Sequence, residues 1–240
     1  MSSSSCFMGR LCLVNHIIDM LVRYCVLTKP PSIVLYCIFI SPVVYKSSLF
    51  KRNWTSQMLD ARRYHQWMQS EELQHLTASE PLTLEEEYSM QQSWLHDANK
   101  CTFIIIKKQE FKRSGNEIGS MVGDTNLFLQ EPEDSQSAEI EIMIAEEKAR
   151  GKKYGWEATL LMLCYGCEVL GIKKFQAKIG LDNVKSISMF SKMGFNKVSE
   201  SNIFQEVTME RIVDNGWKSW LLEQTQGSEQ VKDCYLSLSQ

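Results

Sequence analysis

A short stretch in the second half of the chain constrains the fold most, because its pattern changes abruptly from that of a strand to that of a helix. Residues 139–144 read Glu-Ile-Glu-Ile-Met-Ile. This alternation predicts a strand with Ile140, Ile142 and Ile144 on one face. A basic turn with two glycines follows at residues 150–155, and apolar residues then recur at helical spacing. The stretch therefore predicts a strand, a turn and a helix in direct succession.

The basic turn favours binding of an anion. It reads Arg150-Gly151-Lys152-Lys153-Tyr154-Gly155. The first N–H groups of a helix have no partners within the helix, and the helix dipole favours negative charge at that end, so a phosphate fits there. A basic turn that contains glycine is also common as plain solvated surface. This stretch alone leaves both interpretations open.

The charge is distributed unevenly along the 240 residues, whose formal net charge is −3. Residues 1–55 carry six Lys or Arg against one acid, a net of +5, which leaves −8 for the rest of the chain. Binding to nucleic acid needs a basic face, so the acidic main part argues against it. An acidic surface is compatible with a cationic substrate.

The eight cysteines are irregularly spaced and form no Cys/His set typical of zinc, so we expect no metal site. Cys164 and Cys167 fall inside the expected helix, where reduced thiols in a cytoplasmic protein are the simplest interpretation. No window has the ~18–20 uninterrupted apolar residues that a membrane span requires, so we expect no membrane partner. The start of the chain also lacks the charged segment of a secretory signal.

The order of the expected elements predicts the α+β class. Asp60 is the expected cap of a first helix, and Thr83 with Glu86 forms a capping-box pattern before a second. A polar hairpin loop is expected at residues 111–119. Strands are expected at 102–106, 121–129, 174–179, 195–198 and 204–211, and further helices at 183–193 and 217–224.

The chain divides into three parts by composition. Residues 1–55 form an atypical apolar extension of uncertain fold, in which residues 33–40 could make a strand. Residues 56–226 carry the globular pattern. Residues 227–240 have the composition of a flexible tail.

Three segments together resemble the GCN5-related N-acetyltransferase superfamily over roughly residues 56–225. They are the basic turn, the helix start Asn183-Val184-Lys185-Ser186, and the segment Phe190-Ser191-Lys192-Met193-Gly194-Phe195. The turn is similar to that of the ribosomal-protein-alanine acetyltransferase-like group. Longer phrases, such as residues 76–83 and 124–129, look like the eukaryotic tubulin N-acetyltransferase (N-acetyltransferase nine-like) branch.

The resemblance implies a fold and a reaction. The fold is a central mixed, mostly antiparallel sheet flanked by helices, with the first strand missing or replaced by residues 33–40. The reaction is direct transfer of acetyl from acetyl-CoA, as co-substrate, to an amine of a protein, either tubulin or a protein N-terminus.

The resemblance also assigns roles to residues. Backbone N–H groups around Ile142, Met143 and Ile144 would polarise the thioester, and the turn of residues 150–155, with the charges of Arg150 and Lys152, would hold the pyrophosphate. Asn183 and Ser186 would contact the cofactor. Glu139 and Glu141 are the candidate bases, directly or through water, although acids on a strand are often only solvated. Many relatives have a Tyr near Phe190 as the acid for the leaving thiolate, and here Ser186 is one substitute.

One departure from the family pattern bears on activity. Lys153 stands where the superfamily has Gly, and a positive φ there would cost Lys roughly 1 kcal/mol. Its ammonium could offset this by meeting phosphate charge. Two alternatives to a protein acetyltransferase therefore stay open: a non-catalytic relative that acts by binding, for example to tubulin, and an acetyltransferase for small amines.

Overall fold

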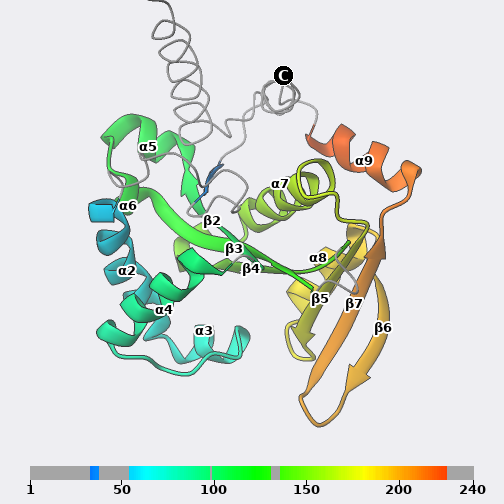
Figure 1. The fold of residues 1–240 in the computed structure, drawn as a ribbon, viewed down its shortest axis with the longest axis horizontal. Coiled ribbons are helices and arrows are strands. Elements are labelled where there is room, and N and C mark those ends of the chain that lie inside the picture. The colour runs from blue at the N-terminus through cyan, green and yellow to red at the C-terminus, as the bar shows by residue number, and fades with distance from the viewer. Residues whose placement is uncertain (1–32, 38–53, 98, 131–135, 226–240) are drawn as a thin grey trace, which may run out of the picture.

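Seven strands lie side by side in one sheet within the part of the chain that the structure describes. The structure is a computed structural model, and it describes residues 33–37, 54–97, 99–130 and 136–225. The strand order is β1-β2-β3-β4-β5-β7-β6 (Figure 1). The strands are β1 Ile33–Cys37, β2 Lys100–Lys107, β3 Met121–Leu129, β4 Ser137–Ile144, β5 Lys174–Gly180, β6 Asn196–Ser201 and β7 Glu206–Ile212.

The sheet is mixed but mostly antiparallel, as expected. β4 and β5 are parallel, and the other neighbouring strands are antiparallel. The helices around it are α2 Trp54–Met68, α3 Glu71–Leu76, α4 Leu84–His96, α5 Lys108–Ser114, α6 Glu117–Ser120, α7 Tyr154–Glu168, α8 Val184–Lys192 and α9 Asn215–Thr225. None of the helices in the described ranges is both long enough and apolar enough to span a membrane.

The alternation of β4 divides its side chains between two apolar cores. Ile140 is buried and Ile142 and Ile144 are half-buried in the larger core, which includes α7. Met143 points to the opposite face and packs with Trp67 of α2 in the smaller core. The predicted facing of the isoleucines is confirmed, and the second face of β4 lies toward α2.

The first strand of the sheet comes from the apolar N-terminal part of the chain. β1 pairs antiparallel with β2, from Ile33↔Lys107 to Cys37↔Phe103, and takes the edge of the sheet. The sequence left two alternatives, a missing first strand or its replacement by residues 33–40, and the structure places a strand at Ile33–Cys37. Residues 1–32, 38–53 and the tail at 226–240 lie outside the described residues, so the domain boundaries stay a prediction.

Two local predictions were wrong. Asp60 does not cap a helix, because α2 begins at Trp54 and carries Asp60 in its interior. The loop expected at residues 111–119 forms α5 and α6 instead. Asn116 begins α6 by accepting a hydrogen bond from the Gly119 N–H at 2.9 Å, and Gly115, at φ 63°, ends α5. The polar composition reflects capping and exposure rather than a loop.

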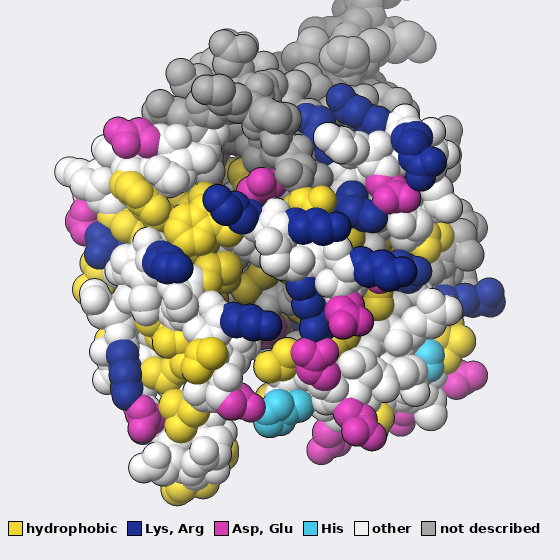
Figure 2. Space-filling view, turned by 180° about the vertical axis from the view of Figure 1, so that it is seen from behind, with side chains coloured by type: hydrophobic (Ala, Val, Ile, Leu, Met, Phe, Trp, Pro, Cys, Tyr) yellow, Lys and Arg dark blue, Asp and Glu magenta, His cyan; other side chains and the backbone are white. Residues whose placement is uncertain are grey.

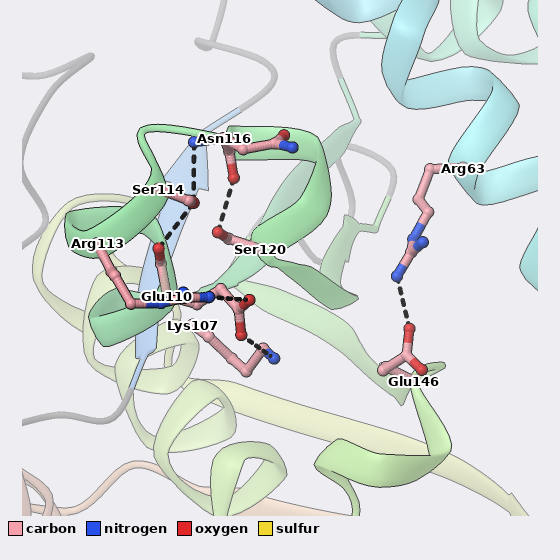
Figure 3. Close-up of polar contacts among 8 residues, drawn as sticks. All are labelled: Arg63, Lys107, Glu110, Arg113, Ser114, Asn116, Ser120 and Glu146. Carbon is pink, nitrogen blue, oxygen red and sulfur yellow. Dashed lines mark hydrogen bonds and ion pairs between the residues drawn. The ribbon is translucent and has the colours of Figure 1, made fainter.

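Side-chain contacts fix these short helices (Figure 3). Glu110 pairs with Lys107 at 2.6 Å and with Arg113 at 3.3 Å. Elsewhere in the same view, Arg63 of α2 pairs with Glu146, just after β4, at 2.6 Å. The Arg63–Glu146 contact ties α2 to the end of β4.

Caps mark the starts of two further helices, and the predicted capping box is confirmed. Thr83 and Glu86 form the capping box of α4, with the Glu86 carboxylate accepting from the Thr83 N–H at 2.8 Å. Asn183 caps α8, and Gly194 follows that helix at φ 85°.

Gly123 is where β3 and β4 approach most closely. A Cβ atom added to Gly123 would lie 1.9 Å from the Met143 carbonyl oxygen. We expect Gly123→Ala to lower the free energy of unfolding by about 3 kcal/mol, because a backbone atom cannot move aside cheaply. Urea unfolding measures this. Gly216→Ala in α9, where the added Cβ meets only the Asp214 side chain at 3.3 Å, is the control and should cost little.

Candidate active site

The two central strands separate after a short parallel stretch. β4 and β5 pair only from Ser137↔Lys174 to Glu139↔Gln176, although β4 continues to Ile144 and β5 to Gly180. Seen from behind, the molecule is hollowed near its middle, with Lys and Arg side chains around the hollow (Figure 2). The divergence therefore leaves one edge of β4 without a neighbouring strand.

The contacts of β4 show which backbone groups face this gap. The Glu141 carbonyl accepts from the Thr125 hydroxyl of β3 at 2.8 Å, and the Met143 carbonyl lies against Gly123 of β3. Because successive residues of a strand direct their N–H and C=O groups to opposite sides, those of Ile142 and Ile144 point toward β5. The Ile142 N–H lies beyond the last β4–β5 pair, facing the gap.

The basic turn presents a run of N–H groups with no acceptor in the described part of the protein. The Arg150 N–H donates to Glu147 at 3.0 Å, and the Glu157 N–H donates to Lys153 at 2.9 Å. The N–H groups of residues 151–156, which lie between them, have no hydrogen bond to the described residues. Gly151 and Lys153 both have positive φ, 73° and 65°. This arrangement of free N–H groups at a helix start suits a phosphate.

The Arg150 side chain is not free to meet an anion. Its Nη1 donates to both carboxylate oxygens of Glu72 at 2.9 Å, and its Nε donates to the Ile144 carbonyl at 2.9 Å. Arg150 thus ties the turn to α3 and to the end of β4. The exposed side chains of Lys152 and Lys153 carry the remaining charge of the turn.

Asn183 and Ser186 lie together at the start of α8. The Asn183 side chain accepts from the Ser186 N–H at 3.1 Å, so the structure gives it the capping role. Its neighbour Asp182 pairs with His75 of α3 at 2.7 Å. α3 therefore contacts both sides of the gap. Glu72 contacts Arg150 in the turn after β4, and His75 contacts Asp182 just after β5.

The two candidate bases differ in their surroundings. Glu139 pairs with Lys178 of β5 at 2.7 Å. Glu141 keeps part of its side chain open to solvent, yet the protein around it and the negative charge of Asp124 raise the pKa of its carboxyl to about 7, against the opposing effect of Lys100. Glu141 is thus the acid that exchanges a proton near neutral pH.

Sequence reasoning missed Asp124, which is buried beside Glu141. Burial raises the pKa of Asp124 to about 6, although a hydrogen bond from Asn126 at 2.9 Å and the charge of Lys100 oppose this. Asn126 in turn accepts from the Thr102 hydroxyl at 2.5 Å. The signal in the sequence was the pair of polar residues at alternate positions, 124 and 126, on one face of a strand that is otherwise mostly apolar.

Lys100 was also missed, and it supplies a cation to the same face. Its ammonium lies 3.3 Å from the ring centroid of Trp94 and 4.7 Å from that of Phe128, within the range of cation–π attraction. Burial lowers the pKa of Lys100 to about 8. The negative charges of Glu141, Asp124 and Asp97 oppose this shift. This face of the sheet accommodates an ammonium group between acids and aromatic rings.

The comparisons with known proteins decide the family. Residues 49–196 match the model of the acetyltransferase (GNAT) domain. The chain belongs to the GNAT family of acetyltransferases. The resemblance expected from the turn and the start of α8 is confirmed, and the protein is an acetyl-CoA-dependent N-acetyltransferase.

Named relatives support this assignment. The chain is 53% identical over 179 residues to the alpha/beta-tubulin-N-acetyltransferase 9 of Homo sapiens, an alignment that covers 74% of this chain and 86% of that protein. It is 57% identical over 148 residues to an N-acetyltransferase 9-like protein of Nematostella vectensis, covering 61% and 75%. A spermidine N-acetyltransferase from Vibrio cholerae, solved with CoA and spermine, shares the fold with a TM-score of 0.56 at 19% identity, covering 68% of this chain and 92% of that one.

Lys153 has a φ of 65°, a backbone conformation that favours glycine. The cost of this conformation to the free energy of unfolding can be tested. We expect Lys153→Gly to raise the free energy of unfolding by about 1 kcal/mol, because the left-handed conformation strains a residue with a Cβ. Urea unfolding measures this. Lys152→Gly, at a position without positive φ, is the matched control and should not stabilise the protein.

Asp124 should make stability depend on pH. The unfolded chain loses this proton near the ordinary pKa of an aspartate, whereas the folded chain keeps it until the pKa of about 6, so stability falls as pH rises between the two. We expect Asp124→Asn to be more stable than the native chain by about 2 kcal/mol near pH 8, with a difference that shrinks toward pH 4. Urea unfolding across this range tests it, and a gain independent of pH would contradict it.

Proposed function

We propose that this chain transfers acetyl from acetyl-CoA to an amine of tubulin or to another protein N-terminus. The observation that carries the proposal is the pairing of two features at one gap: the unpartnered edge of β4 after Glu139 and the open N–H groups of residues 151–156. Together they offer donors for a thioester carbonyl and for a diphosphate. The substrate class rests on the substrate for which the relatives are named and on the acidic charge of the chain after residue 55.

The cofactor would lie along the open edge of β4. The Ile142 N–H would donate to the thioester oxygen as negative charge develops there, which is oxyanion-type stabilisation. The N–H groups after Arg150, with the charges of Lys152 and Lys153, would hold the pyrophosphate. Arg150 itself would act by fixing the turn, since its guanidinium is occupied by Glu72 and Ile144.

Glu141 is the better candidate for the base. The Lys178 ammonium lies 2.7 Å from one carboxylate oxygen of Glu139, so that oxygen is occupied and not free to meet a substrate amine. The pKa of Glu141, raised to about 7 by burial and Asp124, suits a general base working at neutral pH. Ser186, at the start of α8, is the group proposed to return a proton to the leaving thiolate.

A non-catalytic role is the less favoured alternative. It was motivated by Lys153 in place of Gly, but the helix begins normally after Lys153, and the neighbouring N–H groups stay open. A protein amine as acceptor is consistent with cytoplasmic location, which we also propose, since tubulin is the substrate named for relatives.

The test is acetyl transfer by the purified chain. With radiolabelled acetyl-CoA and tubulin, we expect label in tubulin, and we expect Glu141→Gln to lower kcat by about 100-fold or more, because general bases contribute on that scale. Glu223→Gln, at an exposed position of α9, is the matched control and should retain activity. Acetyl-CoA binding without label in tubulin or in any N-terminal peptide would contradict the proposal.

A further inference from the structure

We propose that Asp124 is a positioning residue that works through Glu141, keeping that carboxyl ready to accept the proton of the acceptor amine near neutral pH. This inference rests on the proposed role of Glu141 as the base. Asp124 itself is buried and need not touch the substrate.

The strand register places the two acids on one face as neighbours. Asn126 lies directly opposite Glu141 on β3 and β4, and Asp124 lies opposite Met143. Because residues two apart on a strand share a face, Asp124 is the diagonal neighbour of Glu141. Such diagonal pairs are roughly 7–8 Å apart, close enough for their charges to interact when one of them, here Asp124, is buried.

The bonding of Asp124 is incomplete in a way that packing does not explain. The residue is 3% exposed. One carboxylate oxygen accepts from the Asn126 amide at 2.9 Å, and the other has no partner in the described structure. A buried oxygen left unsatisfied is costly, so its presence in a native protein calls for an explanation, of which a role in catalysis is one.

Asn126 holds this carboxylate in a fixed orientation. Its amide oxygen accepts from the Thr102 hydroxyl at 2.5 Å, which directs its NH₂ group toward Asp124. The column of Thr102, Asn126 and Asp124 crosses two neighbouring strands and is buried throughout. The charge of Asp124 is therefore held at a defined place next to Glu141.

Several charged or titratable groups face this part of the sheet, and they oppose one another. Asp124 and Glu139 favour the protonated form of Glu141, whereas Lys100 and Lys178 favour the anion. The acids also act on Tyr64 of α2, whose pKa is raised by burial and then by Asp124, Glu87 and Glu141. The set comprises Tyr64 and His65 of α2, Glu87 of α4, Lys100 of β2, Asp124 of β3, Glu139 of β4 and Lys178 of β5.

The charge of Asp124 acts on the proton affinity of Glu141. An anion at Asp124 disfavours a second anion at Glu141 and so raises the pKa of the Glu141 carboxyl. In the reaction the acceptor ammonium passes one proton to Glu141, its nitrogen bonds to the acetyl carbon, the C–S bond breaks, and the second proton goes to the thiolate. The fixed anion at Asp124 makes Glu141 a stronger base for the first of these transfers.

The test is the pH dependence of kcat/KM for acetyl transfer to a protein N-terminal peptide. Asp124→Asn keeps the shape of the side chain and removes its charge. The acid limb of the profile, where kcat/KM falls at low pH because Glu141 is protonated, should therefore move to lower pH. We expect the ratio of kcat/KM at pH 6 to that at pH 8 to rise about threefold, as a displacement of half a pH unit requires. Lys100→Met removes the opposing charge and should move the limb to higher pH.

Two opposite displacements separate an electrostatic role from general damage to the fold, which would lower activity without moving the limb. Asp97→Asn is the matched control: Asp97 acts on Lys100 but is absent from the charges acting on Glu141, so the limb should stay in place.

The outcomes show separately whether the inference about Asp124 and the proposed role of Glu141 as the base are correct. If Glu141→Gln is inactive but the acid limb of Asp124→Asn stays where it is in the native enzyme, the inference about Asp124 is overturned and the proposed base stands. If Glu141→Gln keeps full activity, the proposed base fails, and the role of Asp124 fails with it. Opposite shifts for Asp124→Asn and Lys100→Met, with Glu141→Gln inactive, support both.

Discussion

The separation of β4 from β5 is the constraint on which the site depends. Strands in a sheet normally satisfy one another's N–H and C=O groups, and a buried strand edge without a partner is costly. Here the pairing stops at Glu139, so the following groups of β4 require another partner. In the proposed function, a cofactor lying along that edge would satisfy them, and its reactive carbonyl would lie near the acids of the neighbouring face.

α3 connects the two sides of this gap although it has only six residues. Glu72 holds the turn of residues 150–155 through Arg150, and His75 reaches Asp182 before α8. Both pairs are largely exposed and individually weak. Their significance is geometric, because they join segments of β4 and β5 that the sheet itself leaves apart.

The acids near the gap lie in surroundings that cost stability when these groups are charged. Asp124 and Glu141 lie where burial disfavours their charged forms, so each takes up protons at higher pH than an exposed acid. Lys100 partly compensates, and its ammonium is stabilised by Trp94 and Phe128. A purely structural face of a sheet would carry apolar residues at these positions, as it does at Ile104 and Met143.

Most of the fold, and the family, followed from the sequence alone, because strand alternation, capping boxes and the glycine turn are local signals. β4, the capping box at Thr83 and the helix beginning near Asn183 were all predicted from neighbouring residues. Only the tertiary structure decided that Arg150 is occupied by Glu72, that Lys178 pairs with Glu139, and that Asp124 lies beside Glu141. These contacts join residues distant in sequence, and electrostatics depends on distance and burial in space, which no local pattern records.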